Sequence, residues 1–226
     1  MKNTVKITVK IIAIIALAMS ALSLFACKTK IDYFSYVSDL RKDVFVGENE
    51  LFGVTVWAGA RETPYASDGI RNETSLNLTI KVVCKKETGD KITATVAYNE
   101  NEYTRDLSFH PVKSAMSTSF DVKVLPEKQL TVKLDYGEES STLTLDSALS
   151  DDTVPYTVAL EKAADHCADF INRHTEKGNL KAEISVRLLA ENGNNYYYVG
   201  FTATDGEKKA VLIDGENGSV LAEKDN

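Results

Sequence analysis

Apolar and polar residues alternate along most of the chain between Ile31 and Ser147. Turn-forming residues such as Thr88-Gly89-Asp90 separate the alternating segments. The clearest segments are residues 51–57, 76–82, 92–98, 120–124 and 130–134, with a short last piece at 143–145. Successive side chains of a strand point to opposite faces, so this pattern indicates strands with one buried face and one wet face. The pattern predicts two antiparallel sheets packed face to face.

The number of these segments fits a known β architecture. Seven or so strands over about 115 residues are typical of an immunoglobulin-like β-sandwich. The chain lacks the Cys…Trp…Cys arrangement of antibody domains, because its one tryptophan is Trp57 and only Cys84 is a cysteine of this region. The likeness is one of architecture alone, and we expect an all-β sandwich domain over residues 31–147.

The pattern changes after residue 147. Residues 148–155 form a short, polar, acidic segment that we interpret as a linker. Apolar residues then recur at three- and four-residue spacing, which predicts an amphipathic helix that ends at Gly178. The apolar stripe of this helix consists of Leu160, Ala163, Ala164, Cys167, Phe170 and Ile171.

Alternating segments follow the helix and predict an antiparallel meander. They cover residues 180–188, 196–204 and 207–214, with a short piece at 219–221. Asp205-Gly206 is typical of a two-residue hairpin turn. We therefore expect a second domain over residues 156–226, in which the helix packs on the meander. The fold class predicted for the whole chain is α+β.

The end of this second domain resembles the PepSY family. The resemblance rests on Tyr197-Tyr198-Val199-Gly200-Phe201 and on the turn from Asp214 to Leu221, with its Asp-x-x-x-Gly-x-Val-Leu spacing. In such a turn Asp214 can bond the backbone and Gly218 can take a positive φ. The resemblance implies a non-catalytic module outside the membrane that restrains peptidases or binds cell-surface partners. It supplies no catalytic residues.

The first 26 residues have the composition of a secretion signal. Three lysines precede an uncharged apolar stretch, Ile11 to Ala26, which is shorter than the roughly 20 residues that a bilayer span needs. Leu24-Phe25-Ala26-Cys27 resembles the lipobox of bacterial lipoproteins. That resemblance implies cleavage before Cys27, a diacylglyceryl group on its sulfur and a position on the extracytoplasmic side of the cell membrane. Residues 27–30 would form a short tether.

The charge balance excludes one class of partner. The formal net charge is −7, and removal of residues 1–26, which hold three lysines and no acid, would take it to about −10. An acidic surface repels nucleic acid, and no block of basic residues compensates for it. We expect no nucleic-acid partner.

Two cysteines remain beside Cys27. An even pair outside the cell could form a disulfide. However, Cys84 lies at an apolar strand position and Cys167 on the apolar helix stripe, in different predicted domains. We expect two buried thiols, because a free cysteine behaves as a small hydrophobic residue.

One face of the predicted meander carries a candidate partner or inter-domain surface. A two-residue turn at Asp205-Gly206 would place Ala203, Phe201 and Val199 opposite Lys208, Ala210 and Leu212 on the helix side. The opposite side would then hold Tyr196, Tyr198, Val211 and Ile213. An apolar cluster of this kind requires a cover. Two alternatives for what covers this cluster stay open: docking against the β-sandwich, or a binding partner.

The connection from Gly59 to Glu73 provides a second candidate site. Connections of this length are uncommon unless they are functional or flexible. Its candidate binding residues are Trp57, Arg61 and Tyr65, an aromatic–arginine group that could hold a sugar or a peptide. The alternative is an ordinary flexible loop.

No catalytic or metal-binding arrangement is recognisable in the sequence. The three histidines are His110 in an expected loop and His166 and His174 on the expected helix, eight residues apart and too far for joint metal ligation. We expect these histidines to be exposed. Adjacent helix residues point about 100° apart, so His166 and Cys167 do not form a pair. We expect no metal, no cofactor and no catalytic residues.

These observations predict a membrane-anchored extracytoplasmic lipoprotein that binds a protein or peptide, with a peptidase or another envelope protein as its partner. Two alternatives stay open. One is an envelope enzyme with a site built from dispersed carboxylates. The other is a structural or adhesive envelope protein.

Overall fold

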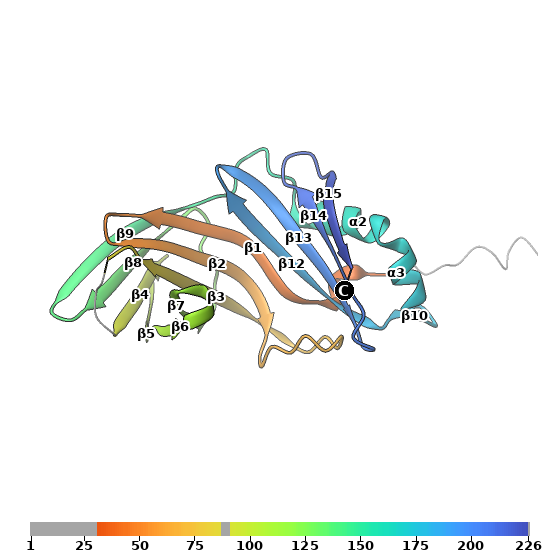
Figure 1. Cartoon of the computed structure of the whole chain (residues 1–226), viewed down its shortest axis with the longest axis horizontal. Helices are drawn as coiled ribbons and strands as arrows, with labels where there is room; N and C mark the ends of the chain where they lie inside the picture. The colour runs from red at the N-terminus through yellow and green to blue at the C-terminus, as the bar shows by residue number, and fades with distance from the viewer. Residues whose placement is uncertain (1–30, 87–90, 226) are drawn as a thin grey trace, which may run out of the picture.

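The computed structural model describes residues 31–86 and 91–225 (Figure 1). The predicted signal (residues 1–26), the tether (residues 27–30) and the lipidation residue Cys27 lie outside this part. The described chain is mostly antiparallel β-sheet with two short α-helices, a β-rich α+β fold. None of the helices in residues 31–86 and 91–225 is long and apolar enough to cross a membrane.

The first part of the described chain is almost entirely strands. A 3-10 helix, η1 (Tyr33–Tyr36), precedes β1 (Val37–Glu48), β2 (Phe52–Glu62), β3 (Thr74–Cys84), β4 (Ile92–Tyr98), β5 (Asn101–Asp106) and β6 (Ser108–His110). A second 3-10 helix, η2 (Pro111–Lys113), leads to β7 (Ala115–Asp121), β8 (Gln129–Tyr136) and β9 (Glu139–Ser147).

Two helices and a run of strands make up the remainder. The helices are α2 (Tyr156–His166) and α3 (Ala168–Arg173). The strands are β10 (Thr175–Glu176), β11 (Asn179–Leu180), β12 (Ala182–Glu191), β13 (Asn194–Ala203), β14 (Lys208–Asp214) and β15 (Val220–Asp225).

Strands β1 to β9 curl around the first hydrophobic core. One run pairs in the order β1-β2-β3-β7-β6, while β1 also pairs with β9, which continues through β8 and β4 to β5. The guanidinium of Arg105 on β5 donates to the carbonyl of Ser119 on β7 at 2.6 Å, so the two runs approach each other at their far ends. Residues from both runs, including Phe52, Ile80 and Leu134, are fully buried between them. The result is one curled, nearly closed antiparallel sheet.

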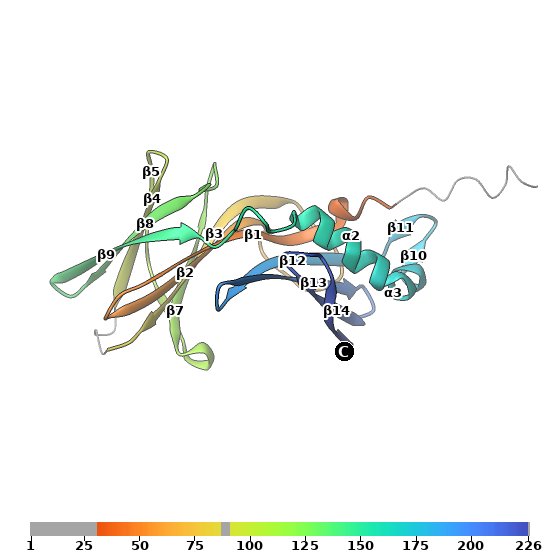
Figure 2. The ribbon, with the colours of Figure 1, turned by 90° about the horizontal axis from the view of Figure 1, so that it is seen from above.

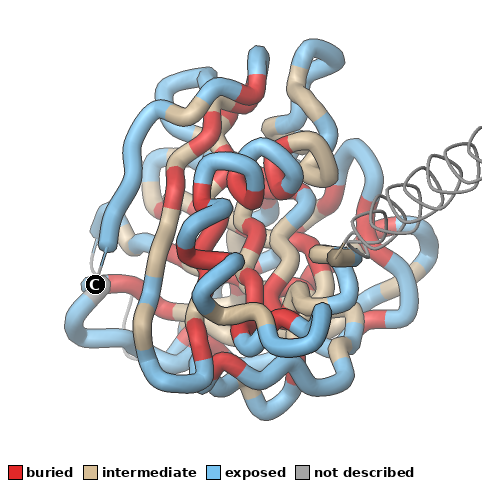
Figure 3. Tube along the Cα trace, turned by 90° about the vertical axis from the view of Figure 1, so that its right-hand side faces the viewer, coloured by how far each residue is buried: buried red, intermediate tan, exposed pale blue. Residues whose placement is uncertain are grey.

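The second core lies between the two helices and β12, β13 and β14 (Figure 2). All six residues of the predicted apolar stripe are buried there, so the amphipathic helix is confirmed. The helix breaks at Cys167 and ends at Arg173, earlier than predicted. Lys177 and Gly178 instead form the positive-φ turn between β10 and β11. Figure 3, an end-on view of the molecule, shows buried residues in the interior and exposed residues at the periphery.

Strand β1 connects the strands that surround the two cores into one sheet. Its first half pairs in parallel with β12, while Asp39 to Glu48 pair antiparallel with β2. Val44 packs in the second core and its neighbour Phe45 in the first, after an irregularity in the β1–β2 register between Arg41 and Asp43. The segment before the irregularity is rich in charge and lacks alternation, so the sequence pattern did not predict this strand or its parallel pairing with β12.

The β13–β14 hairpin differs from the predicted register by one residue. Its turn contains three residues, 204–206, with Gly206 at φ +92°, so Val199 lies opposite Val211 and Tyr197 opposite Ile213. A three-residue turn with a glycine in the left-handed region is the next commonest hairpin connection. The placement of Val211 and Ile213 on the outer face was therefore wrong. Both side chains lie under the helices, with 1% and 0% exposure.

Candidate binding site

A cavity of about 310 Å³ lies on the face of strands β12 to β15 that is opposite the helices. Its floor is formed by β12, β13, β14 and β15, and the connection between β2 and β3 covers one side. Tyr65 of this connection and Tyr198 of β13 both line it. The structure thus brings one residue from each of the two predicted candidate sites to the same place.

Buried Glu62 holds the β2–β3 connection in shape. Its carboxylate, at the end of β2 with 1% exposure, accepts the N–H of Asn72 at 2.9 Å and the N–H of Ala66 at 3.4 Å. The middle of the connection meets the β13–β14 turn at Gly69, which has φ +84°. A Cβ at Gly69 would lie 2.4 Å from the backbone nitrogen of Thr204, so only glycine fits this approach. The connection is therefore an ordered wall of the cavity.

Three arginine–aromatic pairs run along this side of the sheet. The guanidinium of Arg61 lies 4.1 Å from the ring centre of Tyr65. The corresponding distances are 5.2 Å from Arg41 to Trp57 and 5.8 Å from Arg187 to Tyr198. Such pairs are attracted through the negative face of the ring. Tyr65 lines the cavity, whereas Trp57 and Arg61 belong to β2 and do not line it.

Gly200 makes room for the ring of Tyr198. A Cβ at this position would come within 2.9 Å of both Cε1 and Oη of Tyr198, and of Oγ of Ser185 on β12. The ring therefore lies back along its own strand over the glycine. Tyr196 is half-buried and on the same face of β13, but it does not line the cavity.

The position of Arg187 is set by a buried carboxylate on the neighbouring strand. Its Nε donates to Oδ2 of Asp39 at 2.7 Å, and the other carboxylate oxygen lies 3.8 Å from Nε of Arg41. Asp39 is almost fully buried. Burial lowers the pKa of Arg41 most strongly, while the charge of Asp39 opposes this shift. The ion pair is thus a fixed link between β1 and β12.

Glu183 on β12 is a buried acid at the edge of the cavity. The residue is 2% exposed and lines the cavity. Its Oε1 accepts the N–H of Gly69 at 3.5 Å, whereas Oε2 has no hydrogen-bond partner among the described residues. Burial raises the pKa of Glu183 most strongly, while the nearby hydroxyl of Ser38 and the N–H of Gly69 lower it. A buried polar atom without a partner is uncommon and calls for an explanation.

Two lysines border the cavity on the other side. Lys208 of β14 and Lys224 of β15 are exposed and line it. No carboxylate lies within ion-pair distance of either lysine in the described part of the chain. Nζ of Lys208 is 3.5 Å from the hydroxyl of Ser67 in the β2–β3 connection. In a protein with a net charge of −7, this is a local concentration of positive charge.

The lining of the cavity contains few of the side-chain types that catalyse reactions. Glu183 is its one carboxylate among the described residues, and the lining includes neither histidine nor cysteine. A nucleophile with an adjacent base, or a pair of facing carboxylates, is therefore not assembled by the residues that line it. Hydroxyls, two tyrosine rings and cationic side chains dominate, which are groups that bind and orient a ligand.

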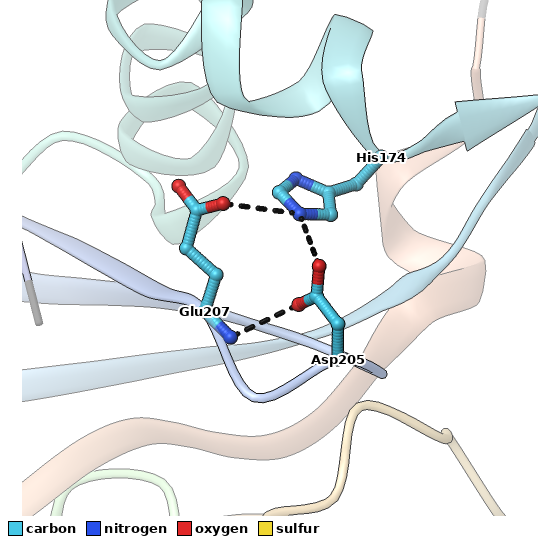
Figure 4. A group of neighbouring side chains, drawn as sticks. All are labelled: His174, Asp205 and Glu207. Atoms are coloured by element: carbon cyan, nitrogen blue, oxygen red, sulfur yellow. Dashed lines mark hydrogen bonds and ion pairs between the residues drawn. The ribbon is translucent and has the colours of Figure 1, made fainter.

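A second cluster, His174 with Asp205 and Glu207, lies at the end of α3 (Figure 4). Nε2 of His174 is 3.3 Å from a carboxylate oxygen of each acid, and Nδ1 is 2.9 Å from the carbonyl of Phe170. Arg173 also pairs with Glu207. The side chain of His174 is 10% exposed, so the expectation of an exposed histidine was wrong here. The contacts fix the β13–β14 turn to the helix end.

Two smaller predictions are confirmed. Oδ1 of Asp214 accepts the N–H of Glu216 at 2.8 Å and of Asn217 at 3.1 Å, and Gly218 has φ +71°. Cys84 and Cys167 are thiols, not a disulfide. Cys167 is buried, and this burial raises its pKa to about 11, so the thiol is not a reactive one. Cys84 is only partly buried, so the expectation of a buried thiol was wrong for this residue.

Comparisons with known proteins add no assignment: no family model, no curated protein and no solved structure matches the chain.

Sequence reasoning missed Glu183, Arg187, Lys208 and Lys224. The first two belong to the regular alternation of residues 180–188, which is typical of a solvated strand face. They could have been found from strand pairing, because the polar face of β12 lies beside Tyr198 on the neighbouring strand β13. The one-residue error in the β13–β14 register hid the further contribution of β14.

Proposed function

We propose that this protein is an extracytoplasmic lipoprotein, tethered through Cys27, that binds a peptide or protein segment without catalysis. The observation that carries the proposal is the cavity shared by Tyr65 and Tyr198, with its ordered wall and polar lining. Tethering rests on the lipobox in the sequence.

The composition of the cavity supports binding of a polar segment. Tyrosine rings offer large contact areas at low cost in conformational entropy, and each carries a hydroxyl for hydrogen bonding. The cavity lies at the low end of the size range of ligand pockets, so it would receive one end or one side chain of a partner. The remaining contact would spread over the exposed sheet around it.

The domain assignments belong to the same proposal. The order of α2, α3 and an antiparallel run of strands supports a PepSY-like domain, as does the Asp214 turn. The two runs of strands pack around one core, which supports the assignment of an immunoglobulin-like sandwich to the curled sheet. A PepSY-like domain favours a peptidase as the restrained partner.

The direct test compares capture by wild-type and cavity-altered protein. We would immobilise the mature protein and the Tyr65→Ala/Tyr198→Ala variant and expose each to detergent-solubilised native membranes. The proposal predicts a partner that the wild type retains and the variant loses. Equal capture by both proteins would contradict a role for the cavity. For the tether, wild-type chain should enter the detergent phase on phase separation, and Cys27→Ser should stay in the aqueous phase.

A further inference from the structure

We infer that the cavity recognises the C-terminal carboxylate of a peptide, an inference that rests on the proposed peptide-binding function. The argument starts from groups in the cavity whose hydrogen-bonding capacity is not fully used. These are the terminal nitrogens of Arg187, the amino groups of Lys208 and Lys224, and Oε2 of Glu183.

Arg187 is the best placed cation. Its Nε is bonded to Asp39, and its two terminal nitrogens make no hydrogen bond to the described residues. The side chain is 29% exposed, so these nitrogens are not sealed in the core. A guanidinium presents paired N–H groups that match the two oxygens of a carboxylate. Since Asp39 and the ring of Tyr198 hold Arg187, its donors are pre-positioned for an anion.

The lysines extend this positive surface across the cavity. Lys208 and Lys224 come from β14 and β15, so the cations approach the cavity from strands beyond β13 while Arg187 approaches from β12. Neither lysine has an acidic neighbour within ion-pair distance in residues 31–86 and 91–225. A bound carboxylate would supply the missing counter-charge.

Glu183 distinguishes a peptide end from other anions. Its unpartnered Oε2 can accept a hydrogen bond, which the ligand must donate. The last residue of a peptide carries a backbone N–H close to its carboxylate, and so offers a donor and an anion together. Phosphate carries more negative charge than a carboxylate near neutral pH, so ionised Glu183 would repel it more strongly. The site therefore favours a monoanion with an adjacent N–H.

The test uses three matched tetrapeptide libraries and the mature protein. The first has acetylated N-termini and free C-terminal carboxylates, and the second has the same sequences with C-terminal amides. The third is amidated and has an internal glutamate. Binding is measured by titration calorimetry, with inorganic phosphate as a further probe. We expect the free acids to bind at least about tenfold more tightly than the amides, since a charged hydrogen-bonded contact contributes more than 1.4 kcal/mol.

Variants connect this preference to the cavity. Lys208→Gln/Lys224→Gln should reduce the preference for free acids about tenfold and reduce its salt dependence, since exposed charges are screened. Both lysines are exposed, so folding should be unaffected. Lys128→Gln removes an exposed lysine of the turn before β8 and should change nothing.

Each outcome of the titrations tests a different part of the inference. Equal binding of free acids and amides would overturn the carboxylate inference and leave peptide binding standing. Equal binding of the internal-glutamate library would overturn the assignment to the C-terminus. Competition by phosphate at the same concentration as the free acids would overturn the role of Glu183. If no library binds, the peptide-binding function itself fails.

Discussion

Nε of Arg187 on β12 lies 2.7 Å from Oδ2 of Asp39 on β1, across the parallel strand pair that unites the two cores. We assign this contact both a structural and a functional role. It joins the curled sheet to the helix-covered sheet, and it holds the guanidinium that we assign to ligand binding. Stability and binding can therefore be tested separately through the residues around it.

Replacement of Asp39 by alanine should destabilise the protein. Arg41 and Arg187 would then face each other without an acid between them, and the expected loss in the free energy of unfolding is about 3 kcal/mol. Urea unfolding measures it. In the double variant Asp39→Ala/Arg187→Leu, the loss should be smaller than the sum of the single losses. Strict additivity would mean that the two residues are not coupled.

Ile213 and Tyr198 should respond differently to serine, because they lie on opposite faces of the sheet. Ile213→Ser creates a cavity and buries a hydroxyl in the second core, so we expect a loss of about 4 kcal/mol. Tyr198→Ser should cost about 1 kcal/mol, since the ring is only partly buried, but should weaken ligand binding. Thermal unfolding and peptide titration separate these effects. Similar stability losses in both variants would contradict the observed register.

Glu62 should control the order of the β2–β3 connection. Glu62→Ala leaves the N–H groups of Asn72 and Ala66 without their acceptor, and we expect a loss of about 2 kcal/mol. Hydrogen exchange should become faster in residues 63–72 than in the wild type. Glu73→Ala, at an exposed acid that ends the connection, is the control and should show no such change. Unchanged exchange in Glu62→Ala would show that another contact holds the connection.

Stability should depend on pH through Glu183. Its pKa in the folded protein is raised above the ordinary 4.5, chiefly by burial and also by the charges of Glu62 and Asp68. A group whose pKa is higher in the folded than in the unfolded protein stabilises the fold. This stabilisation is complete at pH values below the unfolded-state pKa and is lost as the pH rises through the folded-state pKa. Glu183→Gln mimics the protonated acid, so it should gain stability relative to wild type between pH 4.5 and pH 8. Melting curves across this range measure the difference, and a constant difference would refute the assignment.

The two hydrophobic patterns predicted much of the local structure but not the assembly. The stripe from Leu160 to Ile171 specified a helix because helical spacing leaves one apolar face. Alternation likewise located β2, β3, β4 and β8. By contrast, β1 carries Asp39 and Arg41 where it pairs with β12, and the ion pairs of Asp39 with Arg41 and Arg187 make these charges tolerable there.

The candidate site was predicted in separate parts. Tyr65 and Tyr198 were singled out for different reasons, and only the folding of the β2–β3 connection onto β12 and β13 brings them together. Register was the other obstacle. An Asp205-Gly206 pair fits both two- and three-residue turns, and the choice between them exchanges the faces of Val211 and Ile213.

The central claim is that the cavity contacts a partner while the protein is tethered at the membrane. The most direct measurement places a photo-reactive benzoylphenylalanine at Tyr198 in the full-length chain in bacterial cells. A second chain carries it at Phe109, an exposed aromatic residue on β6. We predict a discrete crosslinked product at position 198 that Lys208→Gln/Lys224→Gln reduces, and none at position 109. No product at 198, or the same products at both positions, would contradict the account.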